Sequence, residues 1–154
     1  MTTSIHFHSK STEFDWLSNF SAHPITLENV RWPSVEHFYQ AQKYLGTETA
    51  SQIRYAETPL KARKFGQNRS LSPRSDWDLV KELVMRQAIE AKFSQNRQIR
   101  ELLIATGDAE LVHESSSDLF WGRSSDAIGD NRLGIIIMDV RNQLHEHQPK
   151  KSST

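Results

Sequence analysis

The sequence predicts a mainly α-helical single domain with a small β element near its N-terminus. The chain has 154 residues, of which 36% are hydrophobic, and this provides one core and little more. From residue 34 onward the apolar residues recur at helical spacing, whereas strand-like alternation is confined to short stretches. The domain is expected to span 1–147, and the polar stretch 148–154 is expected to be a disordered tail.

Proline, glycine and turn-forming residues predict where the first elements begin and end. Residues 4–8 alternate like a short strand, and 24–30 forms another that contains its own turn residues. Pro33 suits the first turn of a helix, where its missing N–H costs nothing, and Gly46 supplies a stop. A second, short helix is expected to start at Pro59.

Apolar spacing defines the later helices. One opens at Asp76 and carries an i, i+3, i+4, i+8, i+11 stripe. The next follows Asn96 and stops at Gly107, a strand is expected at 109–113, and a final helix has an apolar face that runs from Leu133. The stripe of the first of these helices is formed by Val80, Leu83, Val84, Ala88 and Ala91.

Composition narrows the classes of function. Lys plus Arg and Asp plus Glu both number 19, so no overall basic field draws the protein to nucleic acid. The absence of cysteine excludes disulfides, thiolate metal sites and a cysteine nucleophile. No leader-like or membrane-length apolar segment is present, which predicts a soluble cytoplasmic protein without membrane partners. The histidines lack metal-binding spacing, so we expect a site without metal or cofactor.

The stretch 32–44, WPSVEHFYQAQKY, carries the clearest chemical pattern. At helical spacing, Glu36, Gln40 and Lys43 fall on nearly the same side. Glu36 would lie in the first turn, where the helix dipole favours its charged form, and an ionised carboxylate suits the stabilisation of an oxocarbenium ion. An exposed ladder of salt bridges is the alternative, but the aromatic residues of this stretch favour a lined pocket.

A serine-rich loop contains a second group of candidates. Trp121 offers a stacking surface, and the adjacent Gly122 lets the backbone approach a flat ligand. Asp118 would bind ribose hydroxyls or a base, or act as a second carboxylate. The alternative interpretation is that Asp118 caps a turn and Trp121 belongs to the core.

Three further segments offer binding groups. The stretch 129–134, GDNRLG, precedes a helix whose N-terminus would receive an anion, although the residues alone favour a tight turn with a helix cap. Trp77 opens a helix, with Lys81 one turn later, and would flank the ligand because a large side chain is hard to bury there. In the turn ending at Phe20, Asn19 would read a base edge or simply fix its loop.

Taken together, the motifs of this chain resemble the NADAR family, also called the YbiA-like N-glycosidases. They keep the family's order from about residue 14 to residue 144. Besides 32–44, they are LSNF at 17–20, DWD at 76–78, KFSQN at 92–96, LIATG at 103–107, DLFWG at 118–122 and GDNRLG at 129–134.

The resemblance implies a compact, mainly helical fold and the hydrolysis of a bond between ribose C1 and a nitrogen. It also implies that DLFWG and GDNRLG bound the family's pocket, which makes Asn131 and Gly134 ligand candidates. Two positions depart from the family pattern. His113 stands where the family usually has glutamate, and Arg123 stands where a small or aliphatic residue is commoner.

Family members are associated with two groups of substrate, early phosphoribosylaminopyrimidine intermediates of riboflavin synthesis and ADP-ribose attached to guanine, including guanine in DNA. We favour the second, because Arg123, Arg132 and the basic run 61–74 suit a diphosphate or nucleic acid. A chain of this kind would accompany a DNA ADP-ribosyltransferase toxin as its counteracting enzyme.

The roles of two residues and one alternative class remain open. Glu36 would stabilise the oxocarbenium-like state or activate water. Lys43 would contact phosphate or the departing base, or attack the ring-opened C1 aldehyde to form an imine. A non-catalytic ADP-ribose or nucleotide reader is the alternative to an enzyme, but a reader has little use for both residues at helical register.

Overall fold

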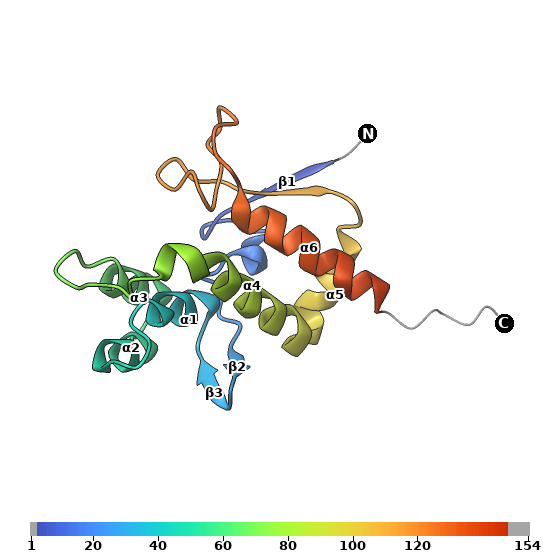
Figure 1. Cartoon of the computed structure of the whole chain (residues 1–154). Helices are drawn as coiled ribbons and strands as arrows, with labels where there is room; N and C mark the ends of the chain where they lie inside the picture. Colours follow the sequence, from blue (N-terminus) through green and yellow to red (C-terminus); the bar gives the residue numbers. More distant parts are fainter. Residues whose placement is uncertain (1–2, 148–154) are drawn as a thin grey trace.

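The computed structural model describes residues 3–147 (Figure 1). It confirms the mainly α-helical class, since helices form most of the regular secondary structure and the strands are short. In chain order the elements are β1 (Ser4–Phe7), a 3-10 turn η1 (Asp15–Leu17), β2 (Ile25–Leu27), β3 (Val30–Trp32), α1 (Val35–Gln42), α2 (Glu48–Arg54), α3 (Pro59–Gly66), α4 (Trp77–Gln95), α5 (Arg97–Ala105), β4 (Glu110–His113) and α6 (Arg132–Glu146). The expected tail at 148–154 lies outside the described residues.

Two small sheets form at separate places in the molecule. β1 pairs in parallel with β4, from Ser4 opposite Glu110 to Phe7 opposite His113. β2 and β3 form an antiparallel hairpin, so the expected strand at 24–30 is interrupted by its turn. Glu28 and Asn29 make that turn at φ values of 52° and 66°, the left-handed conformation that two-residue hairpin loops require.

The helix that carries the chemical pattern begins slightly later than expected. Ser34 is its N-cap and accepts a hydrogen bond from the His37 backbone N–H at 3.2 Å, so Pro33 precedes the helix instead of starting it. The helix ends at Gln42 with Lys43 as its C-cap. Gly46, at φ 81°, closes the turn that follows.

The core lies where α4 packs against α1 and α6 (Figure 1). The buried side of α6 matches the sequence prediction, from Leu133 to Val140. On α4 the expected stripe was partly wrong, because Leu83 is 60% exposed whereas Met85 and Ile89 are buried. The rest of the stripe was largely correct, since three of its members are buried: Val84, Ala88 and Ala91.

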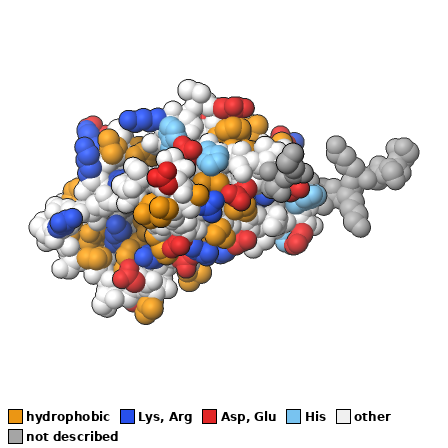
Figure 2. Space-filling view, turned by 90° about the horizontal axis from the view of Figure 1, so that it is seen from above, with side chains coloured by type: hydrophobic (Ala, Val, Ile, Leu, Met, Phe, Trp, Pro, Cys, Tyr) orange, Lys and Arg blue, Asp and Glu red, His pale blue; other side chains and the backbone are white. Residues whose placement is uncertain are grey.

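Helix α2 was not expected from the sequence. Its seven residues bury one side chain, that of Ile53, so no apolar periodicity marks it. On the face shown in Figure 2, basic and acidic side chains are interspersed, in keeping with the equal numbers of each in the sequence. A surface of this kind gives no single field to attract a polyanion.

Candidate active site

A cavity of about 380 Å³ opens between α1, α3, α4 and the loop that follows β4. Its walls combine carboxylates, cations and aromatic rings. The lining includes Ser18, Asn19, Phe20, Glu36, Tyr39, Gln40, Lys43, Arg63, Gln67, Lys81, Met85, His113, Asp118, Phe120 and Trp121.

The structure brings seven of the sequence candidates to this cavity and leaves five outside its lining. Those that line it are Asn19, Phe20, Glu36, Lys43, Lys81, Asp118 and Trp121. Those that do not are Trp77, Gly122, Arg123, Asn131 and Gly134.

Glu36 is a buried carboxyl group on the α1 wall. Its side chain is 6% exposed, and Gln40 Nε2 donates to its Oε1 at 2.8 Å. Burial raises the pKa of Glu36, while the Gln40 hydrogen bond and the charges of Arg63 and Lys43 act in the opposite direction. The sequence predicted that the helix dipole would favour the charged form of Glu36, and burial acts against that form.

An aromatic corner stands beside this carboxyl group. Trp121 Nε1 donates to the Tyr39 hydroxyl at 3.0 Å, and the two rings meet edge to face with centroids 5.6 Å apart. Trp77 lies behind Tyr39, with their centroids 5.1 Å apart. Trp77 therefore supports the wall of the cavity without lining it.

Three cations face the cavity, each close to an aromatic ring. Lys43 Nζ lies 5.7 Å from the ring centroid of Tyr39 and 6.0 Å from that of Trp77. Burial lowers the pKa of Lys43, and the charge of Glu36 opposes this shift. The two other pairs are Lys81 with Phe120, at 4.1 Å, and Arg63 with Phe20, at 5.9 Å.

Asp118 both lines the cavity and holds the loop. Its Oδ1 accepts the backbone N–H groups of Phe120 and Trp121 at 3.2 and 3.0 Å. The turn-capping interpretation is therefore correct, and the second carboxylate oxygen is the one available to a ligand.

Asn131 and Gly134 lie close to β4 and do not line the cavity. Asn131 is 1% exposed. Its side-chain oxygen accepts the His113 N–H at 2.9 Å, and its Nδ2 donates to the Leu111 carbonyl at 2.9 Å. A Cβ atom at Gly134 would come within 2.1 Å of the Leu111 carbonyl oxygen. Both residues thus let α6 pack against β4 and do not reach the cavity.

The start of α6 is not the anion site that the sequence suggested. The backbone N–H groups of Asn131, Arg132 and Leu133 donate at 3.0–3.1 Å to carbonyls of the segment 120–122. With these donors occupied, the helix end has little left to offer an anion at this point. Gly122 lets the loop approach β4 closely, because a Cβ atom at this position would lie 2.8 Å from the His113 carbonyl oxygen.

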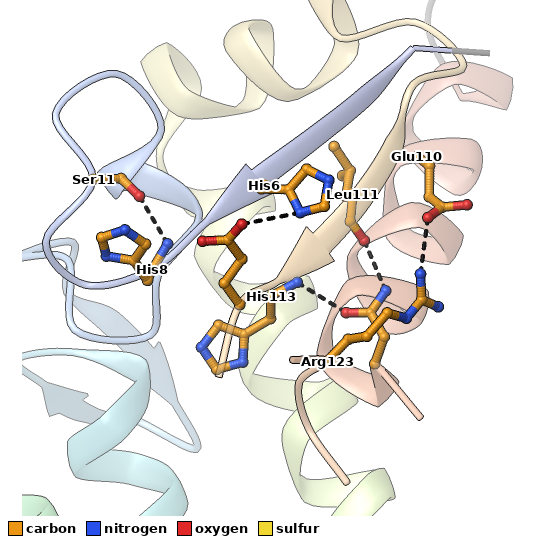
Figure 3. Close-up of polar contacts among 9 residues, drawn as sticks. His6, His8, Ser11, Glu110, Leu111, His113 and Arg123 are labelled. Carbon is orange, nitrogen blue, oxygen red and sulfur yellow. Dashed lines mark hydrogen bonds and ion pairs between the residues drawn. The ribbon is translucent and has the colours of Figure 1, made fainter. Parts of the chain in front are cut away.

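The two arginines that suggested a polyphosphate ligand are engaged elsewhere. Arg123 Nη1 donates to Glu110 Oε1 at 3.1 Å (Figure 3), and Arg132 forms an ion pair with Glu82. In the basic run, Lys61 pairs with Glu57 at 2.5 Å. Arg63 is the member of that run that lines the cavity.

Sequence reasoning missed several lining residues. Tyr39 was assigned only to the aromatic surroundings, and Arg63 only to a basic run. The Met85 sulfur accepts a hydrogen bond from Asn19 Nδ2 at 3.5 Å, and no sequence pattern in its helix marked Met85 as a site residue. His113 was noted only as a departure, although strand alternation places it on the same side as the buried Leu111. Its ring stacks on Phe7 at 5.3 Å, and burial lowers its pKa.

The part of the chain that the structure describes contains no group of three or more His, Cys, Asp or Glu side chains arranged to hold a metal ion. Within residues 3–147, no helix has both the length and the apolar composition needed to cross a membrane.

Comparison with known proteins decides the family. A model of the NADAR domain matches residues 6–145. The chain belongs to the NADAR family. It is 43% identical to N-glycosidase YbiA of Shigella flexneri over 142 residues, which cover 92% of this chain and 89% of that protein. It is 41% identical to N-glycosidase Npun_R5314 of Nostoc punctiforme, over 91% of this chain and 92% of the relative.

The fold of a solved relative agrees. The NMR structure of E. coli YbiA superimposes with a TM-score of 0.86 at 40% identity, over 98% of this chain and 93% of the other. The resemblance to the YbiA-like family is thereby confirmed, and this member is an N-glycosyl hydrolase. The chain also matches riboflavin biosynthesis protein VVA0006 of Vibrio vulnificus at 38% identity, over 97% of this chain but 41% of that protein.

Proposed function

We propose that this N-glycosidase cleaves the bond between ribose C1 and the nitrogen of a phosphoribosylaminopyrimidine. The observation that carries the proposal is the buried Glu36 carboxyl group in a cavity walled by aromatic rings and three cations. In such a site the aromatic rings can stack on the heterocycle, the carboxylate can stabilise positive charge at C1, and the cations can bind the phosphate.

Each wall has a part in the proposed reaction. The Glu36 carboxylate stabilises positive charge that develops at C1 or takes a proton from the attacking water. Tyr39 and Trp121 hold the flat heterocycle, while Arg63 and Lys81 bind the phosphate. Lys43 lines the same cavity as Glu36, with its Nζ near the Tyr39 ring, and its amine would contact C1 or the phosphate.

The choice of substrate differs from the one that the sequence favoured. Arg123 and Arg132, which suggested a diphosphate or DNA, are paired outside the cavity. A volume of about 380 Å³ suits a ligand of mononucleotide size. Proteins similar to this chain in Vibrio vulnificus and Zea mays are named riboflavin biosynthesis proteins, and this supports a phosphoribosylaminopyrimidine.

A specific observation supports ADP-ribose on guanine as a second candidate. A smaller cavity of about 280 Å³ adjoins the first, and Lys43 and Gln67 line both. Arg69 and Trp77 also line this second cavity, where they would contact the distal phosphate and nucleoside of an ADP-ribosyl group. ADP-ribosylated DNA as a substrate, and a toxin as a functional partner, belong to this candidate.

A direct comparison of the two substrates tests the proposal. The purified protein is incubated separately with the phosphoribosylaminopyrimidine and with guanine-ADP-ribosylated DNA, and the released sugar phosphate is measured by mass spectrometry. We expect release of ribose 5-phosphate from the first substrate. Release of ADP-ribose alone assigns the second candidate, and Arg69→Ala should then lower that activity while exposed Arg97→Ala does not.

A further inference from the structure

Lys92 is a fully buried lysine that the proposed reaction does not use. It lies on α4, is 1% exposed, and its Nζ donates to the Ser18 carbonyl oxygen at 2.9 Å. Fully buried lysines are rare unless they are paired with an acid. Among the ion pairs of residues 3–147, Lys92 is not a member.

The Ser18 carbonyl has a second hydrogen-bond donor. It also accepts the Ser21 backbone N–H at 3.1 Å, so it would keep one hydrogen bond without Lys92. Burial lowers the pKa of Lys92 to about 7, with the charge of Asp15 acting in the opposite direction. Placing an ammonium group here therefore opposes folding near neutral pH.

The contact leads directly to the candidate active site. Ser18 and Asn19 both line the cavity. The Asn19 carbonyl accepts the backbone N–H of Glu36 at 3.2 Å. On its other side, Asn19 contacts Met85 on α4. The loop 18–20 thus connects α4, which carries Lys92, with the first turn of α1, which carries the carboxyl group.

The side chain of Asn19 gives loop 18–20 a group that can bind a ligand. Its Oδ1 is buried on the cavity wall without a hydrogen-bond partner. Buried polar atoms are normally paired, so an unpaired oxygen at this position indicates a ligand contact. The oxygen keeps its place only while the loop that carries it is held.

We propose that Lys92 is a positioning residue of the active site, which holds loop 18–20 against α4 and thereby fixes Asn19 and the first turn of α1. It touches no substrate. The activity readout of this inference rests on the proposed function, whereas its structural readouts do not.

The variant Lys92→Met separates positioning from ordinary stabilisation. Methionine has a similar length but no donor and no charge, and apolar replacement of a buried charge is often neutral or stabilising. We expect the unfolding midpoint at pH 7 not to fall. We expect kcat/KM on the phosphoribosylaminopyrimidine to fall about tenfold, the scale of one lost hydrogen bond to a charged group. The Glu36 amide should exchange with solvent faster.

Lys64→Met is the matched control, because Lys64 is exposed on α3. It should change none of these quantities. If Lys92→Met fails to fold or unfolds at a lower midpoint, Lys92 is a structural residue and the inference is wrong. A stable variant with unchanged amide exchange also overturns it. If the wild type releases no sugar phosphate, the proposed function fails, but midpoint and exchange still decide the role of Lys92.

Discussion

The two walls of the cavity are built on different principles. On the α1 wall, Glu36, Tyr39 and Gln40 project from one helix, and their side chains supply the chemistry. On the wall formed by β4 and the following loop, Gly122 lets two backbone segments approach, and the Asn131 side chain bonds to backbone groups of β4. These two residues set the distance between chain segments, and they carry no group into the cavity. The loop wall thus combines residues that line the cavity, such as Trp121, with others that only shape it, whereas the three residues of the α1 wall all line it.

Lys43→Arg tests the helical wall most severely. We expect loss of turnover, because a guanidinium group keeps the charge but cannot form an imine. Borohydride added during turnover should trap a ribosyl phosphate adduct on the wild type, detected by mass spectrometry, and none on the variant. Lys64→Arg should retain both. An active Lys43→Arg enzyme without any trapped adduct would show that the lysine is a charge clamp and that water attacks C1 directly.

Glu36→Gln should lower kcat by at least about a hundredfold, the usual scale for a general acid–base group. Glutamine has nearly the same size, so ligand binding and the unfolding midpoint should change little. Isothermal titration with ribose 5-phosphate and steady-state kinetics measure the two quantities separately. Unchanged turnover would remove Glu36 from the catalytic role.

The pH dependence follows from the same residue. Burial raises the pKa of Glu36 above its ordinary value of 4.5, so the ionised form is lost at a higher pH than for an exposed carboxyl group. Activity should decline by up to about tenfold per pH unit below that pKa, and the residual activity of Glu36→Gln should not show this decline.

The free energy of unfolding should change with pH in the opposite direction to the activity. The native carboxyl group binds its proton more tightly, so stability falls as pH rises from 4.5 through the raised pKa.

Asn131→Ala tests the loop wall. The change leaves the His113 N–H and the Leu111 carbonyl without their buried partner, and we expect a loss of about 3 kcal/mol in the free energy of unfolding. Denaturant titration measures it. Activity per folded molecule should stay within about threefold of wild type. A large fall in kcat in a stably folded variant would instead assign Asn131 a direct part in catalysis.

Arg123→Ala should have the smallest effect. Its ion pair with Glu110 is partly exposed, and such pairs contribute less than about 1 kcal/mol. We expect KM for the phosphoribosyl substrate to remain within about twofold. A tenfold rise in KM would show that the arginine leaves Glu110 to bind phosphate.

The same contrast explains how far the sequence could predict the molecule. Helical periodicity predicted that Glu36 and Lys43 share one face, because a helix fixes which side chains lie together, and both line the same cavity. It did not reveal the raised pKa of Glu36, since the degree of burial depends on elements distant in the sequence. In the loop, the sequence could not tell a glycine that admits a ligand from one that admits another backbone segment. Helix α2 was missed because a single buried residue leaves no pattern.

The parallel pairing of β1 with β4 has a consequence for synthesis. β1 is synthesised before its partner strand, which follows only after α5. Until β4 is made, the backbone edge of β1 is unpaired, and His113, on which Phe7 stacks, has not been synthesised. Closing such a distant pair is slow compared with forming local helices. The α1 wall can therefore form early, whereas the cavity is completed only after β4 and the loop that follows it have been synthesised.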